Sequence, residues 1–186
     1  PEPPSSGVRG RSRTDLRGLE WRYLWQECQS DALLKLCQKT NNIGALAASA
    51  DGKWVAVGEV GTGLISVWDW RTRQEIAGLP AGPLRPRLAF SPRVLLLAYC
   101  TTNDYATHER TVQLWDGATR QVLPVQLPIG VAWCQALVFS EDGQTLVTST
   151  AKPANEITLW RVPEGRKLAV YAAPQPVSWG TAFAVT

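Results

Sequence analysis

The sequence predicts an all-β fold that is assembled from one repeated unit. A six-residue segment occurs three times, as Leu-Ile-Ser-Val-Trp-Asp at 64–69, Thr-Val-Gln-Leu-Trp-Asp at 111–116 and Glu-Ile-Thr-Leu-Trp-Arg at 156–161. Its tryptophans lie 47 and 45 residues apart, and a period of this length is typical of a propeller array. Apolar and polar residues alternate within each copy, as they do in a β-strand. We therefore expect a partial β-propeller of about three four-stranded antiparallel blades.

Each copy of the segment has large residues on both faces. Ile65 and Val67 share one face of the predicted strand, and Trp68 falls on the other. Trp115 and Trp160 take the same position in the later copies. A sheet that is covered on both sides, as a blade is by its neighbours, accounts for this pattern.

Length and composition are those of one globular domain. The chain has 186 residues, of which 45% are hydrophobic and 19% charged, so it is long enough to bury a sizeable core. The formal net charge of +3 is mild, and the excess is not concentrated in the repeats, so it does not argue for nucleic acid. No run approaches the roughly 18 apolar residues of a membrane span, and no signal peptide is visible. We expect a cytoplasmic protein. The absence of methionine and an ending inside a repeat suggest a piece of a longer chain.

The cysteines and the single histidine do not form a metal-binding pattern. Cys28, Cys37, Cys100 and Cys134 are well separated, and none belongs to a Cys-x-x-Cys motif. His108 is the only histidine, whereas a zinc site takes about four ligands at a recognisable spacing. We expect neither a metal nor a cofactor, and we interpret Cys100 and Cys134 as interior packing, because no basic residue close to them in sequence would activate a thiol.

The N-terminal segment divides into a tail and a helix. Residues 1–13 are rich in Pro, Gly, Ser and Arg and are predicted to be a disordered linker; the alternative is a basic arm that binds nucleic acid. Residues 14–30 are predicted to form a short helix, with Thr14 as its N-cap. Its apolar residues form two adjoining stripes, Leu16, Leu19 and Tyr23, and Trp21, Trp25 and Cys28. We expect this helix to pack on or cap the propeller, and the alternative is a partner-binding helix.

Residues 31–186 are predicted to hold the repeats. In the first copy we expect an outer strand over 32–37 and then strands over 43–49, 54–58, 64–68 and 74–77. Asp51 and Gly52 form an Asp-Gly pair, which is a strong signal for a hairpin turn.

The second and third copies follow the same order. In the second copy we expect strands over 87–91, 94–100, 111–115 and 121–127. In the third copy we expect strands over 133–140, 145–149, 156–160 and 167–171, with a turn at Asp142 and Gly143. Residues 177–186 are predicted to be the inner strand of a fourth, truncated copy.

From residue 31 onward the chain resembles the WD40 repeat family. Phe90-Ser91-Pro92 and Phe139-Ser140-Glu141-Asp142-Gly143 end two inner strands in the manner of that family, and Trp68-Asp69 and Trp115-Asp116 match its Trp-Asp pair. The resemblance implies structural roles in the repeat for Trp68, Asp69, Trp115, Asp116, Trp160, Asp51, Gly52, Asp142 and Gly143. The family's Gly-His dipeptide is missing before every inner strand. The family's His–Ser–Trp–Asp hydrogen-bond network is therefore not expected to form completely in any copy, and stability should rest more on apolar packing.

A second resemblance concerns residues 15–25, which read Asp-Leu-Arg-Gly-Leu-Glu-Trp-Arg-Tyr-Leu-Trp. This segment looks like the stretch that precedes the propeller in large bacterial multidomain proteins, including Ser/Thr protein kinases. The resemblance implies a sensor or scaffold portion with the kinase domain upstream.

The sequence offers little for catalysis, and we expect no enzyme. Residues 58–63 hold three glycines, but Leu64 and Ile65 stand where a phosphate-binding loop needs Lys and Ser or Thr. No kinase catalytic loop and no Gly-x-Ser-x-Gly nucleophile motif is present. Asp51 and Asp142 fit roles in turns rather than a pair of acid and base.

Polar loops are the remaining candidates for function. Residues 85–87, 101–110 and 151–155 join predicted strands, and loops on a rigid scaffold are where binding residues concentrate. They are also where insertions are tolerated, and both readings stay open. The candidate partner-binding residues are Arg85, Arg87, Asp104, Tyr105, His108, Glu109, Arg110, Lys152 and Asn155.

Three hypotheses for function follow. The first is a non-catalytic protein-interaction scaffold, whose incomplete ring would be closed by further repeats or by a second copy. The second is the regulatory region of a bacterial Ser/Thr kinase. The third is nucleic-acid binding through the Arg-rich tail, with an affinity that falls steeply with salt.

Overall fold

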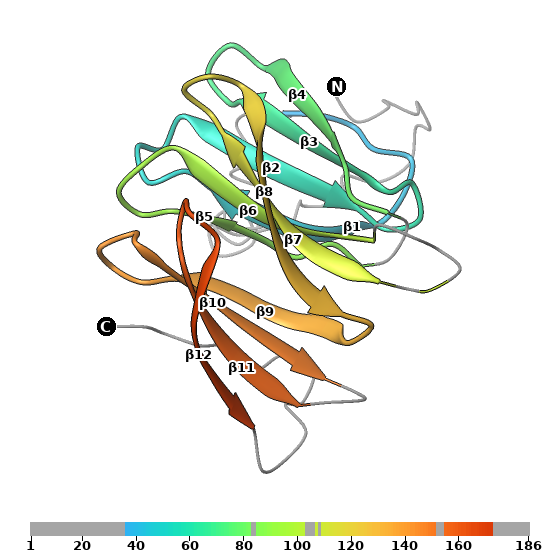
Figure 1. Ribbon diagram of the computed structural model, residues 1–186. Helices are drawn as coiled ribbons and strands as arrows, with labels where there is room; N and C mark the ends of the chain where they lie inside the picture. Colours follow the sequence, from blue (N-terminus) through green and yellow to red (C-terminus); the bar gives the residue numbers. More distant parts are fainter. Residues whose placement is uncertain (1–35, 83–84, 103–106, 108, 152–154, 173–186) are drawn as a thin grey trace, which may run out of the picture. The chain divides into compact units, whose positions relative to one another are not determined.

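The computed structural model describes residues 36–82, 85–102, 107, 109–151 and 155–172. Within these residues the chain forms strands β1 to β12 and no helix, in three antiparallel sheets of four strands each (Figure 1). Each sheet is built from four consecutive strands paired in chain order, so we call them blades 1, 2 and 3. The predicted tail, helix and fourth inner strand lie outside the described residues.

Blade 1 consists of β1 (Ile43–Ala48), β2 (Trp54–Glu59), β3 (Leu64–Asp69) and β4 (Gln74–Pro80). These four strands agree with the sequence prediction to within a few residues. The strand expected over 32–37 is wrong where it can be checked, because Leu36 and Cys37 belong to no strand. Apolar residues favour a strand only when a neighbouring strand offers a free edge, and no sequence pattern shows whether that edge exists.

Blade 2 consists of β5 (Leu88–Phe90), β6 (Leu96–Thr102), β7 (Arg110–Asp116) and β8 (Gln121–Gly130). Its inner strand is the shortest of the twelve. Blade 3 consists of β9 (Trp133–Phe139), β10 (Thr145–Ala151), β11 (Glu156–Arg161) and β12 (Arg166–Ala172).

Each blade packs on the next through one face. A core cluster between blades 1 and 2 joins Ile65 and Val67 to Tyr99 and Trp115, and the Trp115 ring tilts against that of Trp54 with centroids 5.5 Å apart. The cluster between blades 2 and 3 consists chiefly of Leu96, Ala98, Val112, Leu114, Leu127, Leu137, Phe139, Leu146 and Trp160. Blade 2 is therefore buried on both faces, which confirms the reading of its repeated segment.

The repeated tryptophan lies beside an irregularity in every blade. The pairing of the third strand with the fourth shifts register between Val67 and Trp68, and also between Leu159 and Trp160. In blade 2 the shift lies between Gln113 and Trp115. A β-bulge turns the local twist and re-aims a side chain, so the repeat includes a backbone feature as well as a residue.

Blades 1 and 3 share one hydrogen-bonded turn between their first two strands. Ser140 Oγ donates to Asp142 Oδ1 at 2.5 Å, and the backbone N–H of Gln144 donates to the same carboxylate at 2.9 Å. Ser49 and Asp51 make the equivalent bonds, with 2.6 Å between Ser49 Oγ and Asp51 Oδ1. These contacts are local, which is why the Asp-Gly pairs identified the turns from sequence alone.

The aspartates of these two turns should make the stability of the fold depend on pH in the acid range. The hydrogen bond from the neighbouring serine is the main cause that lowers the pKa of Asp51 and of Asp142 below the usual value of 3.8. A lowered folded-state pKa contributes stability above the unfolded-state pKa, and this contribution is lost as the pH falls through the folded-state value. The melting temperature of the native chain should exceed that of an Asp51→Asn/Asp142→Asn variant near neutral pH, and the difference should shrink below 3.8.

Thermal unfolding followed by circular dichroism across roughly pH 2 to 7 measures this difference. A difference that stays constant through the acid range would contradict the assignment, since asparagine does not titrate.

A single side chain decides whether the repeated tryptophan has a hydrogen-bond partner. In blade 3 the indole Nε1 of Trp160 donates to Thr148 Oγ1 at 3.0 Å. The strand register places Val57 at the equivalent position in blade 1, and there the Trp68 Nε1 is buried without a partner. Blade 2 has Tyr99 at this position, and its hydroxyl donates to Gln113 Oε1 at 2.7 Å.

Placing valine at position 148 should destabilise the fold, and placing threonine at position 57 should stabilise it. Thr148→Val leaves the Trp160 indole N–H buried and unpaired, so we expect a loss of about 1–3 kcal/mol in the free energy of unfolding. Val57→Thr supplies an acceptor to Trp68 and should add about 1 kcal/mol or less. Urea unfolding of the two variants measures both changes. Equal destabilisation by both would mean that shape, not the hydrogen bond, matters at this position.

Candidate functional site

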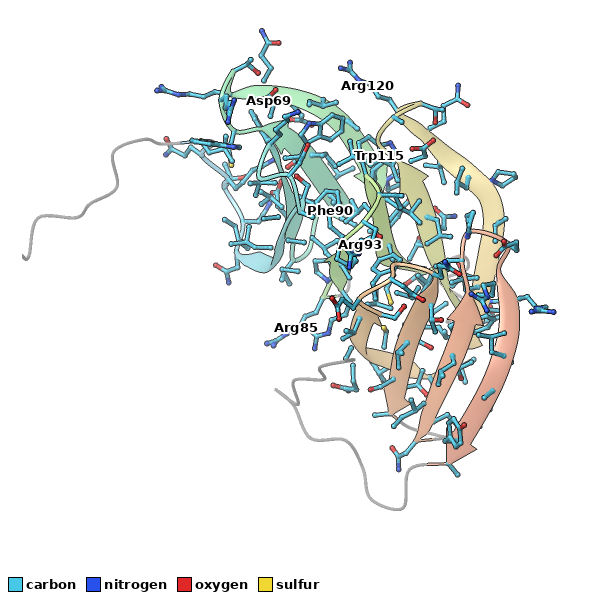
Figure 2. The ribbon with its side chains drawn as sticks, turned by 90° about the vertical axis from the view of Figure 1, so that its left-hand side faces the viewer. Asp69, Arg85, Phe90, Arg93, Trp115 and Arg120 are labelled. Atoms are coloured by element: carbon cyan, nitrogen blue, oxygen red, sulfur yellow. The ribbon has the colours of Figure 1, made fainter. Side chains whose placement is uncertain are left out.

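Antiparallel blades bring the predicted loops to a common end. In each blade the turns after the first and third strands lie at one end, so the connection after the second strand and the connection to the next blade lie at the other. Figure 2 shows Asp69, after the third strand of blade 1, far from Arg85, which lies between blades 1 and 2. The described residues of the segments 85–87, 101–110 and 151–155 all belong to the Arg85 end, although the sequence separates them widely.

A small pocket lies at this end between blades 2 and 3. It has a volume of about 20 Å³, which is room for about one water molecule. Its lining residues are Arg85, Pro86, Cys100, Thr101, Thr102, Arg110, Trp133 and Cys134. Two of the predicted partner-binding residues, Arg85 and Arg110, are thus brought together with two thiols and an exposed aromatic side chain.

Arg110 is a buried cation that joins the two blades. It begins β7 and is only 6% exposed. Its Nη1 donates to the carbonyl oxygen of Val131 at 2.7 Å and to that of Ala132 at 3.3 Å. Its guanidinium carbon lies 4.3 Å from the centroid of the Trp133 ring, a cation–π contact. Burial is the main cause that lowers the pKa of Arg110, and because the pKa of a guanidinium is so high, the group stays charged.

Cys100 and Cys134 lie next to each other across the boundary between the blades. Burial is the main cause that raises the pKa of Cys100 well above its usual value of 9.0, and the hydrogen bond with Cys134 adds to it. The Sγ of Cys134 also lies 3.7 Å from the carbonyl oxygen of Ala136, to which it donates.

A bulge in the inner strand aims Cys134 at blade 2. Strict alternation would place Cys134 on the face of Ala136, away from Leu137 and Phe139. The register of β9 with β10 shifts between Ser149 and Thr150, so that Cys134 packs instead on the cluster that contains Leu137 and Phe139.

The structure places both cysteines in the packing between blades 2 and 3, as the sequence predicted, with Cys134 half-buried. The sequence did not indicate the positive charge beside them: Arg110 lines the same pocket as both cysteines, and the charges of Arg87 and Arg110 partly offset the burial that raises the pKa of Cys100. Neither arginine is close to both cysteines in sequence, so no motif could have shown this electropositive surrounding. Only the packing of blade 2 on blade 3 brings the charge of Arg110, at the start of β7, close to both cysteines.

The other predicted partner-binding residues are more scattered. Glu109 is exposed beside Arg110, and Arg87 is half-buried with its Nε unpaired. Asn155 is half-buried, and its Oδ1 also lacks a partner. Asp104, Tyr105, His108 and Lys152 lie outside the described residues. The structural residues of the repeat are at the strands and turns described above, not in this pocket.

An ion pair at the Arg85 end of blade 1 was not predicted. Lys39 Nζ lies 2.9 Å from Glu59 Oε1, with the two side chains 16% and 7% exposed. Lys39 Nζ also lies 5.6 Å from the centroid of the Trp68 ring. Glu59 is the last residue of β2. The glycine-rich segment at 58–63 therefore begins in a strand, and the carboxylate of Glu59 within it is already paired with Lys39. Nothing in the spacing of Lys39 and Glu59 signals this pair.

A wider hollow lies at the other end of blade 3. It has a volume of about 560 Å³ and is lined by Gln144, Arg161, Glu164 and Arg166. Arg161 Nη1 donates to Gln144 Oε1 at 2.8 Å across it.

The described residues contain no group of three or more His, Cys, Asp or Glu side chains that could hold a metal ion. Within the described ranges, no helix has the length and apolar character to cross a membrane. No model of a known protein family matches the chain, and no curated protein matches it either.

Proposed function

We propose that this chain is a non-catalytic protein-interaction scaffold whose blades are WD40 repeats. One observation carries the proposal, namely the surface at the Arg85 end of blades 2 and 3. There the Trp133 side chain is 44% exposed and Val131 is 47% exposed, while Arg85 is exposed beside them in the lining of the pocket. Tryptophan and arginine are the residues most enriched at the energetic centres of protein interfaces.

The surface is also held in place, which favours binding. Arg110 stacks on Trp133 and is tied to the carbonyl oxygens of Val131 and Ala132, immediately before β9. A side chain that is ordered before binding loses less conformational entropy when a partner covers it. The class of partner that this surface suits is a protein with an apolar or aromatic group to set against Trp133.

Two matched tryptophans allow a test. Trp133 at the Arg85 end is 44% exposed and Trp70 at the opposite end is 40% exposed. We would use the chain as bait in extracts of its source cell and quantify bound proteins by mass spectrometry. Trp133→Ala should remove the bound proteins and Trp70→Ala should leave them. A bound set that is lost with Trp70→Ala, or unchanged by Trp133→Ala, would contradict the location.

The second proposal is that the chain belongs to a bacterial Ser/Thr kinase as a regulatory region. Its support is the resemblance of residues 15–25 to the segment that precedes such propellers. Reading the coding sequence upstream is the test, because the kinase catalytic loop and Asp-Phe-Gly motif are unmistakable. Their absence upstream would end this proposal and leave the scaffold proposal intact.

A further inference from the structure

Two thiols from neighbouring blades share one pocket of the fold. Cys100 lies near the end of β6 in blade 2 and is 8% exposed, whereas Cys134 on β9 of blade 3 is half-buried. Both line the pocket that Arg85 and Arg110 border, and both are free thiols. They lie close together, since both pack in the cluster between blades 2 and 3, and a hydrogen bond with Cys134 contributes, after burial, to the raised pKa of Cys100.

We propose that Cys134 and Cys100 form an oxidation site at which hydrogen peroxide links blade 2 to blade 3 through a disulfide. The geometry carries three parts of this proposal. The bulge in β9 turns Cys134 towards blade 2, the pocket is open to about one water-sized molecule, and the positively charged Arg110 lines the same pocket as both cysteines.

The two cysteines differ in their exposure to solvent, as a two-step oxidation requires. The thiolate is the reactive form of cysteine, and access to the oxidant decides which of two thiols reacts first. Cys134 is the more exposed of the two and is the thiol that peroxide reaches first. Cys100 is buried and its burial keeps it protonated, so it is protected from direct oxidation and serves as the resolving thiol.

The chemistry balances in two steps. The thiolate of Cys134 attacks one oxygen of hydrogen peroxide, the O–O bond breaks, and the products are a sulfenic acid on Cys134 and hydroxide. The sulfur of Cys100 then attacks the sulfenic sulfur, the S–O bond breaks, and the thiol proton leaves with the oxygen as water. Overall, two thiols lose two electrons and two protons, and the peroxide is reduced to water.

The disulfide would add a covalent link between blade 2 and blade 3. Residues 100 and 134 enclose β7, β8 and the turn that Arg110 holds, so the new bond closes a long loop that contains half of blade 2. Cross-linking a loop of this size restricts the unfolded chain and stabilises the folded one. The same bond fixes the strand that carries Trp133.

The experiment uses the full chain with Cys28→Ser and Cys37→Ser, so that only the two pocket cysteines remain. The folded protein is treated with hydrogen peroxide, its free thiols are blocked, and it is digested without reduction for mass spectrometry. We expect an intact mass lower by two hydrogens and a peptide that joins Cys100 to Cys134, both reversed by dithiothreitol. The melting temperature should rise by roughly 5–10 °C on oxidation.

Two controls distinguish this site from nonspecific oxidation. The linked peptide should form at least about tenfold faster in the folded protein than in urea, because folding holds the sulfurs together. In a Cys100→Ala variant the cross-link should be lost, and dimedone should label Cys134 as a sulfenic acid.

The proposal is overturned if the native chain pairs Cys28 or Cys37 instead, or if cross-linking is equally fast in urea. It is also overturned if Cys134 proceeds to sulfinic or sulfonic acid while Cys100 keeps its thiol. None of these outcomes depends on whether a protein partner binds at Trp133.

Discussion

Replacing Trp115 with alanine should lower the free energy of unfolding by about 3–5 kcal/mol. The Trp115 side chain is 1% exposed and is the largest fully buried side chain of the described residues. It belongs to the cluster that joins blades 1 and 2, in contact with Tyr99 and with the ring of Trp54. Its removal would open a cavity between two sheets, and the strands of both sheets are held by their hydrogen bonds and cannot close over it.

Urea unfolding monitored by circular dichroism measures the effect, and Trp70→Ala is the matched control. Trp70 is 40% exposed, so its removal opens no enclosed cavity and should cost less than the removal of Trp115. A similar cost for both variants would mean that Trp115 does not organise the boundary between the blades. A change in the urea dependence as well as in the midpoint would show that blade 1 unfolds separately.

Gly165→Ala should destabilise the chain by roughly 2–4 kcal/mol. Gly165 lies in the turn between β11 and β12 with a φ of 74°, and its N–H donates to the carbonyl oxygen of Arg161 at 2.9 Å. A Cβ at this position would overlap Val125 and lie 3.2 Å from Leu127 Cδ2, both on β8 of blade 2. The substitution therefore combines backbone strain with a clash against the neighbouring blade.

The other two blades provide the control for Gly165. Arg73 and Arg120 stand at the equivalent turn positions, each with a φ of 58°, and both are exposed. Arg73→Gly and Arg120→Gly relieve the left-handed conformation and should change stability by no more than about 1 kcal/mol in either direction. If Gly165→Ala were as mild as these changes, the contact with β8 would not constrain the turn.

The sheet architecture was readable from sequence because its signals are local. Alternating side chains place Ile65, Val67 and their counterparts on buried faces whatever the rest of the chain does. The Ser-x-Asp-Gly turns close through bonds between residues at most five positions apart, such as Ser49 and Trp54. The 47- and 45-residue spacing shows that the same local pattern of strands occurs three times.

The sequence predicted only part of the candidate site. Arg85 and Arg110 were predicted as members of polar loops, and the structure does bring them to one pocket. Trp133 was read only as the start of a strand, although it is the most exposed aromatic side chain of that pocket. The Arg110 stack that holds it joins the first residue of β7 to the first residue of β9. Such a pair has no fixed sequence spacing, so no motif could indicate it.

The sequence by itself determined the class of fold, the order of the strands and the tight turns, because each depends on neighbouring residues. The tertiary structure alone decided the rest. It left Leu36 and Cys37 out of any strand, paired Lys39 with Glu59, and used a one-residue bulge to turn Cys134 towards Cys100. A bulge reverses every face assignment beyond it, and its position depends on which blade packs alongside, a contact between residues far apart in the chain.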